Sequence, residues 1–212
     1  MDLQKYWASK HSYYATTEWI DKPSLFAKFA IKYFPKTGKL LDLGAGQGQD
    51  SRYFAKKGYE VISTDFSDKA LEISRKNTTT AGLTFPIEKL DLGKGKLPYP
   101  DQSFEIVYAN LSLHYFSDKI TSELFAEIHR VLKPKGIFAA LFNTIEDPKI
   151  KTMTFLRDGL YQNSLGLQKR FFSLDYLKNK IINKFVPLIL DDCGPMHDPA
   201  KPQKLIRLIG RK

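Results

Sequence analysis

The sequence predicts an α/β fold, in which a doubly wound and mostly parallel sheet has helices on both faces. Two observations support this prediction. Strand-like segments alternate with helix-like segments from residue 39 to residue 142, and a glycine-rich turn follows the first strand and opens a helix. Alternation at this spacing is typical of parallel βαβ units, whose helices cover both faces of the sheet.

Individual elements carry local signals. Apolar residues at helical spacing from Leu25 to Tyr33 predict a helix before the first strand, with Pro23 at its first position. The hydroxyl of Ser67 is placed to cap a helix, and Pro-Lys-Gly at 134–136 is expected to close a longer one. The expected strands are residues 39–43, 59–64, 84–89, 104–109 and 137–142, and the expected helices are 51–57, 68–77 and 118–132.

The pattern weakens after residue 143. Ser173 is placed to cap a helix over 174–183, and residues 184–190 and 205–211 are expected to form a terminal pair of strands. The link from Asp191 to Pro199 is rich in turn residues. It suits a hairpin that closes one edge of the sheet.

Length and composition predict a single globular domain over residues 1–212. Hydrophobic residues make up 42% and charged residues 26% of the chain, which excludes a disordered or fibrous protein. The only cysteine, Cys193, allows no internal disulfide and indicates a reducing compartment. Because no apolar run reaches the ~18 residues of a membrane span and no signal-peptide pattern is present, we expect a cytoplasmic protein without membrane contact.

The net charge of +10 is concentrated in the last third of the chain. Residues 149–212 carry 13 basic and 5 acidic residues. One interpretation is a surface for nucleic acid or for an anionic substrate. The other is a solvated, lysine-rich surface, which we favour because the basic residues form no dense run.

The strongest local signal is the segment Leu-Leu-Asp-Leu-Gly-Ala-Gly-Gln-Gly at residues 40–48. Its glycines allow close approach of a ligand to the backbone, and the helix that follows offers unpaired N–H groups. The spacing Gly-x-Gly-x-Gly differs from that of dinucleotide sites, and no Gly-Lys-Ser/Thr follows for a phosphate loop. Asp42 would repel a pyrophosphate but can hold a cationic amine. The ligand is therefore expected to be a nucleoside that carries an amino acid.

Two acids follow the next strands. Asp65 lies 19 residues after Gly46, where a carboxylate can accept hydrogen bonds from both ribose hydroxyls. Its alternative role is to cap the helix after Ser67. Asp91, after the third expected strand, can accept from an exocyclic adenine amine, while Leu92 covers the ring.

Residues 40–142 resemble the class I S-adenosylmethionine-dependent methyltransferases. The resemblance rests on five segments in order: residues 40–48, Val-Ile-Ser-Thr-Asp-Phe-Ser at 61–67, Leu-Asp-Leu at 90–92, Ser-Phe-Glu-Ile-Val-Tyr-Ala-Asn at 103–110 and Ile-His-Arg-Val-Leu-Lys-Pro-Lys-Gly-Ile-Phe at 128–138. Family members commonly have Cys in place of Ala45 and Asp in place of Glu105. Residues 48–51, Gly-Gln-Asp-Ser, are further similar to the tellurite-resistance and thiopurine-like enzymes, with Gln49 replacing their arginine.

The resemblance implies a Rossmann-like sheet of seven strands with an antiparallel last strand. It also implies that residues 38–143 form the cofactor-binding core, and that residues 144–212 form the substrate side and edge hairpin. S-adenosylmethionine is then the cofactor and S-adenosylhomocysteine the product. The expected cofactor contacts are Asp42, Gly44, Ala45, Gly46 and Gly48 at the methionine part, Asp65, Phe66, Asp91 and Leu92 at the ribose and adenine, and Asn110 and Leu111 at the sulfonium.

His114 is the candidate general base, because it follows the fourth strand at the edge where open α/β sheets bind ligands. Its alternative role is structural, and His129 is expected to be structural. No set of residues has the spacing of metal ligands, so no metal is expected. After the fourth strand, Asn-Leu-Ser-Leu replaces the Asn-Pro-Pro-Tyr of enzymes that methylate exocyclic base amines. Cys193 is equally poorly placed to attack a pyrimidine ring.

Residues 1–22 are rich in aromatic side chains and form either a lid over the site or a packed cover. The segment contains Tyr6, Trp7, Tyr13, Tyr14 and Trp19. Substrate contacts are expected at Tyr6, Trp7, Tyr14 and Tyr115.

The favoured function is methyl transfer to a small-molecule acceptor by in-line displacement. One alternative, motivated by the basic C-terminal third, is a methyltransferase that acts on RNA or protein. Another is a module that binds the cofactor without catalysis. A nicotinamide-dependent dehydrogenase is disfavoured by the glycine spacing.

Overall fold

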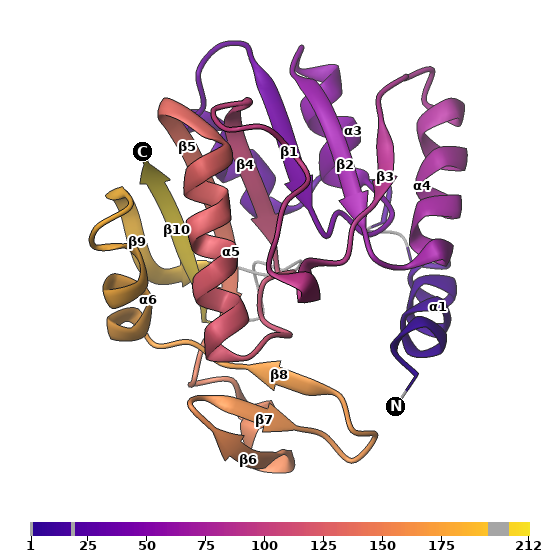
Figure 1. Ribbon diagram of the computed structural model, residues 1–212. Coiled ribbons are helices and arrows are strands. Elements are labelled where there is room, and N and C mark those ends of the chain that lie inside the picture. The colour runs from indigo at the N-terminus through magenta and orange to yellow at the C-terminus, as the bar shows by residue number, and fades with distance from the viewer. Residues whose placement is uncertain (1, 18–19, 195–203) are drawn as a thin grey trace.

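The computed structural model describes residues 2–17, 20–194 and 204–212, and it contains a seven-stranded sheet with the strand order β3-β2-β1-β4-β5-β10-β9 (Figure 1). Six strands run parallel and β10 runs antiparallel to its two neighbours, β5 and β9. The predicted doubly wound, seven-stranded fold is thereby confirmed. The strands of this sheet are β1 (Lys39–Leu43), β2 (Glu60–Asp65), β3 (Ile87–Lys89), β4 (Phe104–Asn110), β5 (Leu132–Asn143), β9 (Val186–Gly194) and β10 (Leu205–Arg211).

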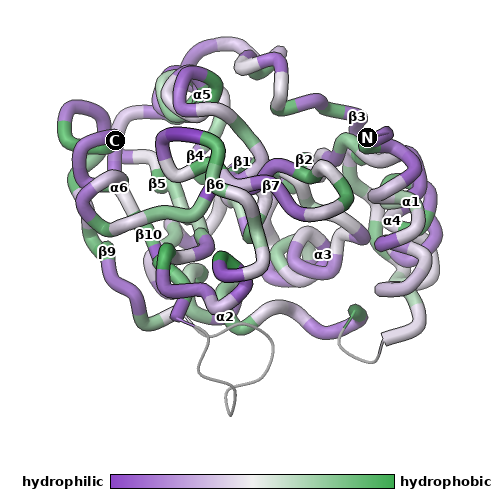
Figure 2. Tube along the Cα trace, turned by 90° about the horizontal axis from the view of Figure 1, so that it is seen from below, coloured by the Kyte–Doolittle hydropathy of each residue, from purple (hydrophilic) through white to green (hydrophobic). Residues whose placement is uncertain are grey.

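Helices lie on both sides of the sheet. Figure 2 shows α5 and α6 on one side and α2 and α3 on the other. The helices are α1 (Leu3–Tyr14), α2 (Leu25–Ala30), α3 (Gln49–Lys56), α4 (Asp68–Thr80), α5 (Asp118–Val131) and α6 (Leu174–Ile181), with short 3-10 turns η1 (Ile31–Tyr33), η2 (Leu92–Lys94) and η3 (Pro148–Thr152). Within the described residues, no helix is long and apolar enough to cross a membrane.

The central strands are apolar on both faces, because each face packs against helices. Leu40 of β1 belongs to the cluster that contains Phe26 and Phe54 from α2 and α3, whereas its neighbour Leu41 packs with Leu124 of α5. Successive side chains of a strand point to opposite faces. This is why the neighbouring residues Leu40 and Leu41 of β1 are both fully buried.

Several predicted boundaries are confirmed and others are corrected. Ser67 and Ser173 cap α4 and α6, as predicted. Pro23 is not the first helical residue, because the hydroxyl of Ser24 accepts from the amide of Ala27 and caps α2. The Pro-Lys-Gly sequence at 134–136 lies inside β5, where a register shift against β4 absorbs it.

The ends of three other elements also shift. Strand β3 is shorter than the predicted 84–89, and α3 begins at Gln49 rather than at residue 51. The residues from Asp191 to Gly194 extend β9 instead of forming a turn, because they pair with β10. The rest of the predicted link, residues 195–199, lies outside the described residues.

Two elements were not predicted. Helix α1 has no apolar stripe to predict it, since His11 is its one buried residue among those described. Between β5 and α6 in the sequence, the chain forms a separate antiparallel sheet. It consists of β6 (Thr154–Arg157), β7 (Leu160–Gln162) and β8 (Gln168–Arg170). Its strands are too short to show a periodic pattern. Figure 1 places this small sheet and α1 at the same end of the molecule.

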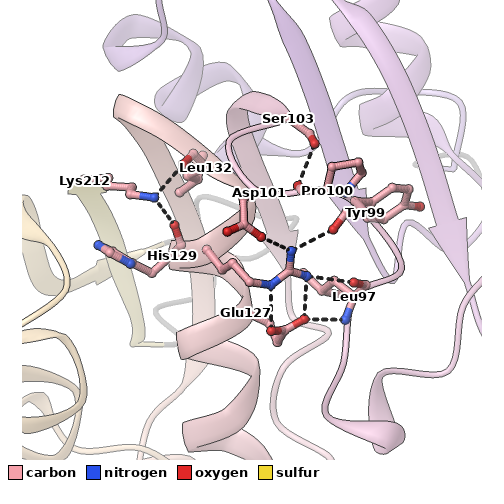
Figure 3. Close-up of polar contacts among 10 residues, drawn as sticks. Leu97, Tyr99, Pro100, Asp101, Ser103, Glu127, His129, Leu132 and Lys212 are labelled. Carbon is pink, nitrogen blue, oxygen red and sulfur yellow. Dashed lines mark hydrogen bonds and ion pairs between the residues drawn. The ribbon is translucent and has the colours of Figure 1, made fainter.

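Arg130 of α5 holds the segment that leads into β4, and Figure 3 labels the residues that it bonds, Leu97, Tyr99, Asp101 and Glu127. Its guanidinium donates to the carbonyl oxygens of Leu97 and Tyr99 at 2.9 and 2.8 Å. It also donates to the carboxylates of Asp101 and Glu127, and Glu127 in turn accepts from the amide of Leu97. These contacts satisfy backbone groups that have no partner in a helix or a strand.

We predict that Arg130→Ala lowers the free energy of unfolding by about 2 kcal/mol, because it strands partly buried carbonyl oxygens and a carboxylate. Urea unfolding measures the effect. Lys69→Ala is the control, since it removes only a surface ion pair with Glu72 within one helix and is expected to cost less than about 0.5 kcal/mol. Equal losses in the two variants would contradict the prediction.

Candidate cofactor and acceptor site

The predicted site residues meet at the carboxyl ends of the parallel strands. Strand β1 lies between β2 and β4, and the chain winds outward from it in both directions. This is the point at which open α/β sheets bind ligands. In Figure 1 these strand ends face α1 and the β6–β8 sheet, which cover the same end.

The glycine loop after β1 is held against β2 by its own backbone. The amide of Ala45 donates to the carbonyl oxygen of Thr64, and the amide of Gly46 donates to the Asp65 carboxylate at 2.8 Å. Gly46 has a φ of +58°, and a Cβ there would lie 3.3 Å from Cε1 of His11. The loop therefore requires glycine at this position both for its backbone conformation and for the close approach of α1.

Asp42 lies beneath this loop and is almost fully buried. Its carboxylate accepts from the hydroxyl of Ser51 at 2.6 Å, and burial raises the pKa of Asp42 well above its usual range. It lines the smaller of two cavities at the site. Its structural role is thus to join β1 to α3 beneath the ligand loop.

The larger cavity has a volume of about 670 Å³ and collects the residues predicted for ribose and adenine. Its carboxylates come from Asp65 and Asp91, and Phe66 and Leu92 follow them in the sequence. Asp91 also caps η2 by accepting from the amide of Gly93. The predicted residues that line this cavity are Gly44, Gly46, Asp65, Phe66, Asp91, Leu92, Leu111, Trp7 and Tyr115.

The smaller cavity, of about 130 Å³, lies at the other end of the glycine loop. It is lined by Asp42, Gly44, Ala45, Gly46 and Asn110 of the predicted set, together with Tyr14. Gly48 is among the lining residues of neither cavity and instead precedes α3 as its N-cap, with a φ of +74°.

Three buried polar atoms around the smaller cavity have no hydrogen-bond partner among the described residues. They are Nδ1 of His11, Oε1 of Gln47 and Oδ1 of Asn110. Buried polar atoms are nearly always paired, so a ligand in this cavity would supply partners that these atoms lack. Two of them are amide oxygens that only accept, which suits an ammonium group. The residues present therefore fit a nucleoside that carries an amino acid.

Asp50 orients Asn110 and was missed as a site residue. Its buried carboxylate accepts from the amide and hydroxyl of Ser24, the hydroxyl of Tyr108 and Nδ2 of Asn110. Because Nδ2 of Asn110 is engaged, Oδ1 is the atom left for the ligand. The position of Asp50 in the first turn after the glycine loop was the available signal.

Helix α1 covers both cavities. Trp7 lines the larger cavity, Tyr14 the smaller, and His11 both. The helix is attached by Gln4, whose Nε2 donates to the carbonyl oxygen of Phe66, and by Gln47, whose Nε2 donates to that of His11.

His11 was missed, although its spacing from Trp7 and Tyr14 matches one face of a helix. Of the other predicted aromatics, Tyr6 packs edge-on against Trp7 but lines neither cavity, and Tyr13 is exposed. Trp19 lies outside the described residues.

His114 lies behind the cavity wall. It is 2% exposed, its ring stacks obliquely on Tyr115 with centroids 4.2 Å apart, and it is among the lining residues of neither cavity. Burial and the nearby Lys169 ammonium lower the pKa of His114 well below its usual range, so the imidazole is neutral at pH 7. A neutral imidazole can accept a proton, but His114 would reach a ligand only through a change in the wall. Among the described residues, no group of three or more acidic, histidine or cysteine side chains is arranged to hold a metal.

The fold and site together define a nucleoside-binding α/β domain whose ligand carries an amino acid. Residues 41–140 match the family model described as a methyltransferase domain. The match spans just under half of the chain and supports the predicted resemblance to the class I S-adenosylmethionine-dependent methyltransferases. S-adenosylmethionine, predicted from the sequence, is confirmed as the cofactor of this family.

Curated relatives share the core of the domain. The glycine/sarcosine/dimethylglycine N-methyltransferase of Actinopolyspora halophila is 35% identical over 136 residues, which are 62% of this chain and 23% of that protein. The ubiquinone/menaquinone biosynthesis C-methyltransferase UbiE of Bordetella avium is 37% identical over 114 residues, which are 52% and 43% of the two chains. The chain thus spans less than half the length of these relatives.

A solved structure shares the fold over the whole chain. Burkholderia thailandensis 1,6-didemethyltoxoflavin-N1-methyltransferase, solved with 1,6-didemethyltoxoflavin and S-adenosylhomocysteine, has a TM-score of 0.76 at 18% identity and covers 100% of this chain and 85% of its own. The closer resemblance to tellurite-resistance and thiopurine-like enzymes is not confirmed by the comparisons.

We predict that Gly46→Ala weakens the binding of S-adenosylhomocysteine at least ~10-fold, because the new methyl group projects into the wall shared by both cavities. Titration calorimetry measures the affinity. Gly82→Ala is the matched control, since Gly82 has a similar φ of +67° but open space where a Cβ would lie. Both variants are expected to lose about 1 kcal/mol of stability. Equal affinity for S-adenosylhomocysteine in the two variants would contradict the prediction.

The buried imidazole of His114 predicts that stability falls in mild acid. The unfolded chain binds a proton at this residue as the pH falls through about 6.5, whereas the folded protein does so only at lower pH. The stabilisation that comes from keeping His114 neutral is therefore fully present above pH ~6.5. It is lost as the pH falls toward the pKa of His114 in the folded protein. In urea unfolding between pH 7 and pH 5, His114→Gln should reduce the slope of unfolding free energy against pH. An unchanged slope would contradict the prediction, because it would show that His114 takes up a proton equally in the folded and the unfolded protein.

Proposed function

We propose that this protein transfers a methyl group from S-adenosylmethionine to a small-molecule acceptor by in-line displacement. When bound, the cofactor supplies a methyl group activated on a sulfonium. The observation that carries the proposal is the continuation of the larger cavity beyond the nucleoside residues. There it is walled by Trp7, Tyr115 and Leu167.

The chain's own residues provide binding, alignment and exclusion of water. The loop at Gly44–Gly46 and the carboxylate of Asp65 hold the ligand. Asn110, expected at the sulfonium from the resemblance, lines the smaller cavity, so we assign its Oδ1 to the ammonium group instead. Helix α1 lies over both cavities and keeps water from the reacting centre. For an acceptor that loses a proton, we keep His114 as the base proposed from the sequence, with His11 as the better exposed candidate, since it lines both cavities.

The basic C-terminal third gives less support to an RNA or protein substrate. Several of its cationic side chains are paired within the molecule: Lys178 with Asp175, Lys180 with Asp118, Lys204 with Glu146, and Arg207 with Asp191. Paired cations are less available to phosphates than a free basic surface would be. The named acceptor of the Burkholderia enzyme is also a small molecule, which favours the same class here.

The proposal predicts thermal stabilisation by S-adenosylmethionine and S-adenosylhomocysteine but not by NAD. A ligand at ~100 times its Kd stabilises by about 2.7 kcal/mol, which raises Tm by roughly 5–10 °C for a chain of this size. A shift with NAD alone would contradict the proposal. A shift with the two sulfur nucleosides leads to an acceptor panel, in which release of S-adenosylhomocysteine is measured. Tight binding without turnover across small molecules, RNA and peptides would instead favour a non-catalytic module.

A further inference from the structure

The acceptor side of the larger cavity is built from three separate parts of the chain. Helix α1 contributes Trp7, the loop after β4 contributes Tyr115 and Phe116, and the turn between β7 and β8 contributes Leu167. The rings of Trp7 and Tyr115 pack edge to face with centroids 5.2 Å apart. These walls present aromatic and aliphatic surface to whatever enters.

Hydrogen bonds within the turn between β7 and β8 hold Leu167 at the wall of the larger cavity. The side-chain oxygen of Asn163 accepts from the amides of Leu165 and Leu167, and the amide of Asn163 donates to the carbonyl oxygen of Leu167. Leu167 is 7% exposed and lines the cavity, whereas Leu165 on the same turn is 66% exposed. One leucine of this turn thus forms part of the wall, while the other faces solvent.

Arg170 fixes this turn to the loop after β4. It is fully buried, and its backbone amide donates to the carbonyl oxygen of His114 at 2.6 Å. Its side chain donates to the carbonyl oxygens of Phe116 and Asp158 and lies over the ring of Tyr176. Arg170 therefore fixes the position of Leu167 relative to Phe116 across the larger cavity.

None of the residues that line the acceptor side of the larger cavity carries a charged side chain. The charged side chains that line the cavity are Asp65, Asp91 and Lys94, all of which lie at or beside the nucleoside residues. Lys169 packs over the ring of Phe171 and is not among the lining residues. The hydroxyl of Ser112 is engaged with the carbonyl oxygen of Leu43, and that of Ser117 caps α5.

We propose that the acceptor is an uncharged, flat aromatic molecule, bound between α1 and the β7–β8 turn, and that Leu167 is its specificity-determining residue. This inference rests on the proposed function. A charged group placed against these walls would lose its hydration without gaining a counter-ion. A planar ring instead gains edge and face contacts with Trp7 and Tyr115.

The experiment compares two probes of the same shape and different charge. Protein saturated with S-adenosylhomocysteine is titrated with 2-naphthol, which is neutral at pH 7, and with 2-naphthoate, which is anionic, and binding is followed by ligand-observed NMR. We expect 2-naphthol to bind at least ~10-fold more tightly than 2-naphthoate. Leu167→Glu should weaken the binding of 2-naphthol at least ~10-fold, whereas Leu165→Glu, on the same turn but facing solvent, should change it less than ~2-fold.

The affinity for S-adenosylhomocysteine, measured first by calorimetry in all three proteins, separates the two proposals. If the unsubstituted protein did not bind S-adenosylhomocysteine, the proposed function itself would be overturned. With that binding intact, the acceptor class is overturned by equal or tighter binding of 2-naphthoate, by failure of 2-naphthol to bind, or by 2-naphthol binding that Leu167→Glu leaves unchanged. Displacement of 2-naphthol by bulk transfer RNA would overturn it in favour of a nucleic-acid substrate.

Discussion

The buried carboxylate of Asp50 is the interaction on which the arrangement of the site depends. It accepts from the backbone and hydroxyl of Ser24 at the start of α2, from Tyr108 of β4 and from Asn110 at the end of β4. A buried charge is tolerated only where donors surround it, and here the donors come from separate elements. Asp50 itself belongs to α3, so one carboxylate joins α2, α3 and β4 at the ligand loop.

This junction also determines the chemistry that the loop offers. Because Asp50 accepts from Nδ2 of Asn110, Oδ1 of that side chain is left without a partner among the described residues. Gln47 is oriented in the same way, since its nitrogen donates to the carbonyl oxygen of His11. Two side-chain amides, each held by its donor end, thus present acceptors to one small cavity. The carboxylates of Asp42 and Asp50 line the same cavity, so its lining is suited to a cationic group.

The sheet edge and its two covers make different contributions. The edge carries the residues proposed to bind the nucleoside, and these residues lie in loops held by neighbouring strands. The covers are α1 and the β6–β8 sheet, which reach the cavity from segments far apart in the sequence. Their contacts with the edge are few and specific: Gln4 and Gln47 attach α1, and Arg170 attaches β8. Of the two covers, α1 lines both cavities through His11, whereas the turn between β7 and β8 lines only the larger one.

The sequence by itself determined the core of the sheet and predicted a set of cofactor residues, because both depend on local patterns. Apolar strands, helix caps such as Ser67 and Ser173, and glycines at positive φ act within a few residues of the chain. It did not reveal α1 or the β6–β8 sheet, whose side chains are buried only against distant segments. The same reason explains His11, Asp50 and Leu167, which became site residues through packing at long range. Only the tertiary structure showed that His114 lies behind the wall while His11 lines both cavities, since burial of a side chain is decided by what folds over it.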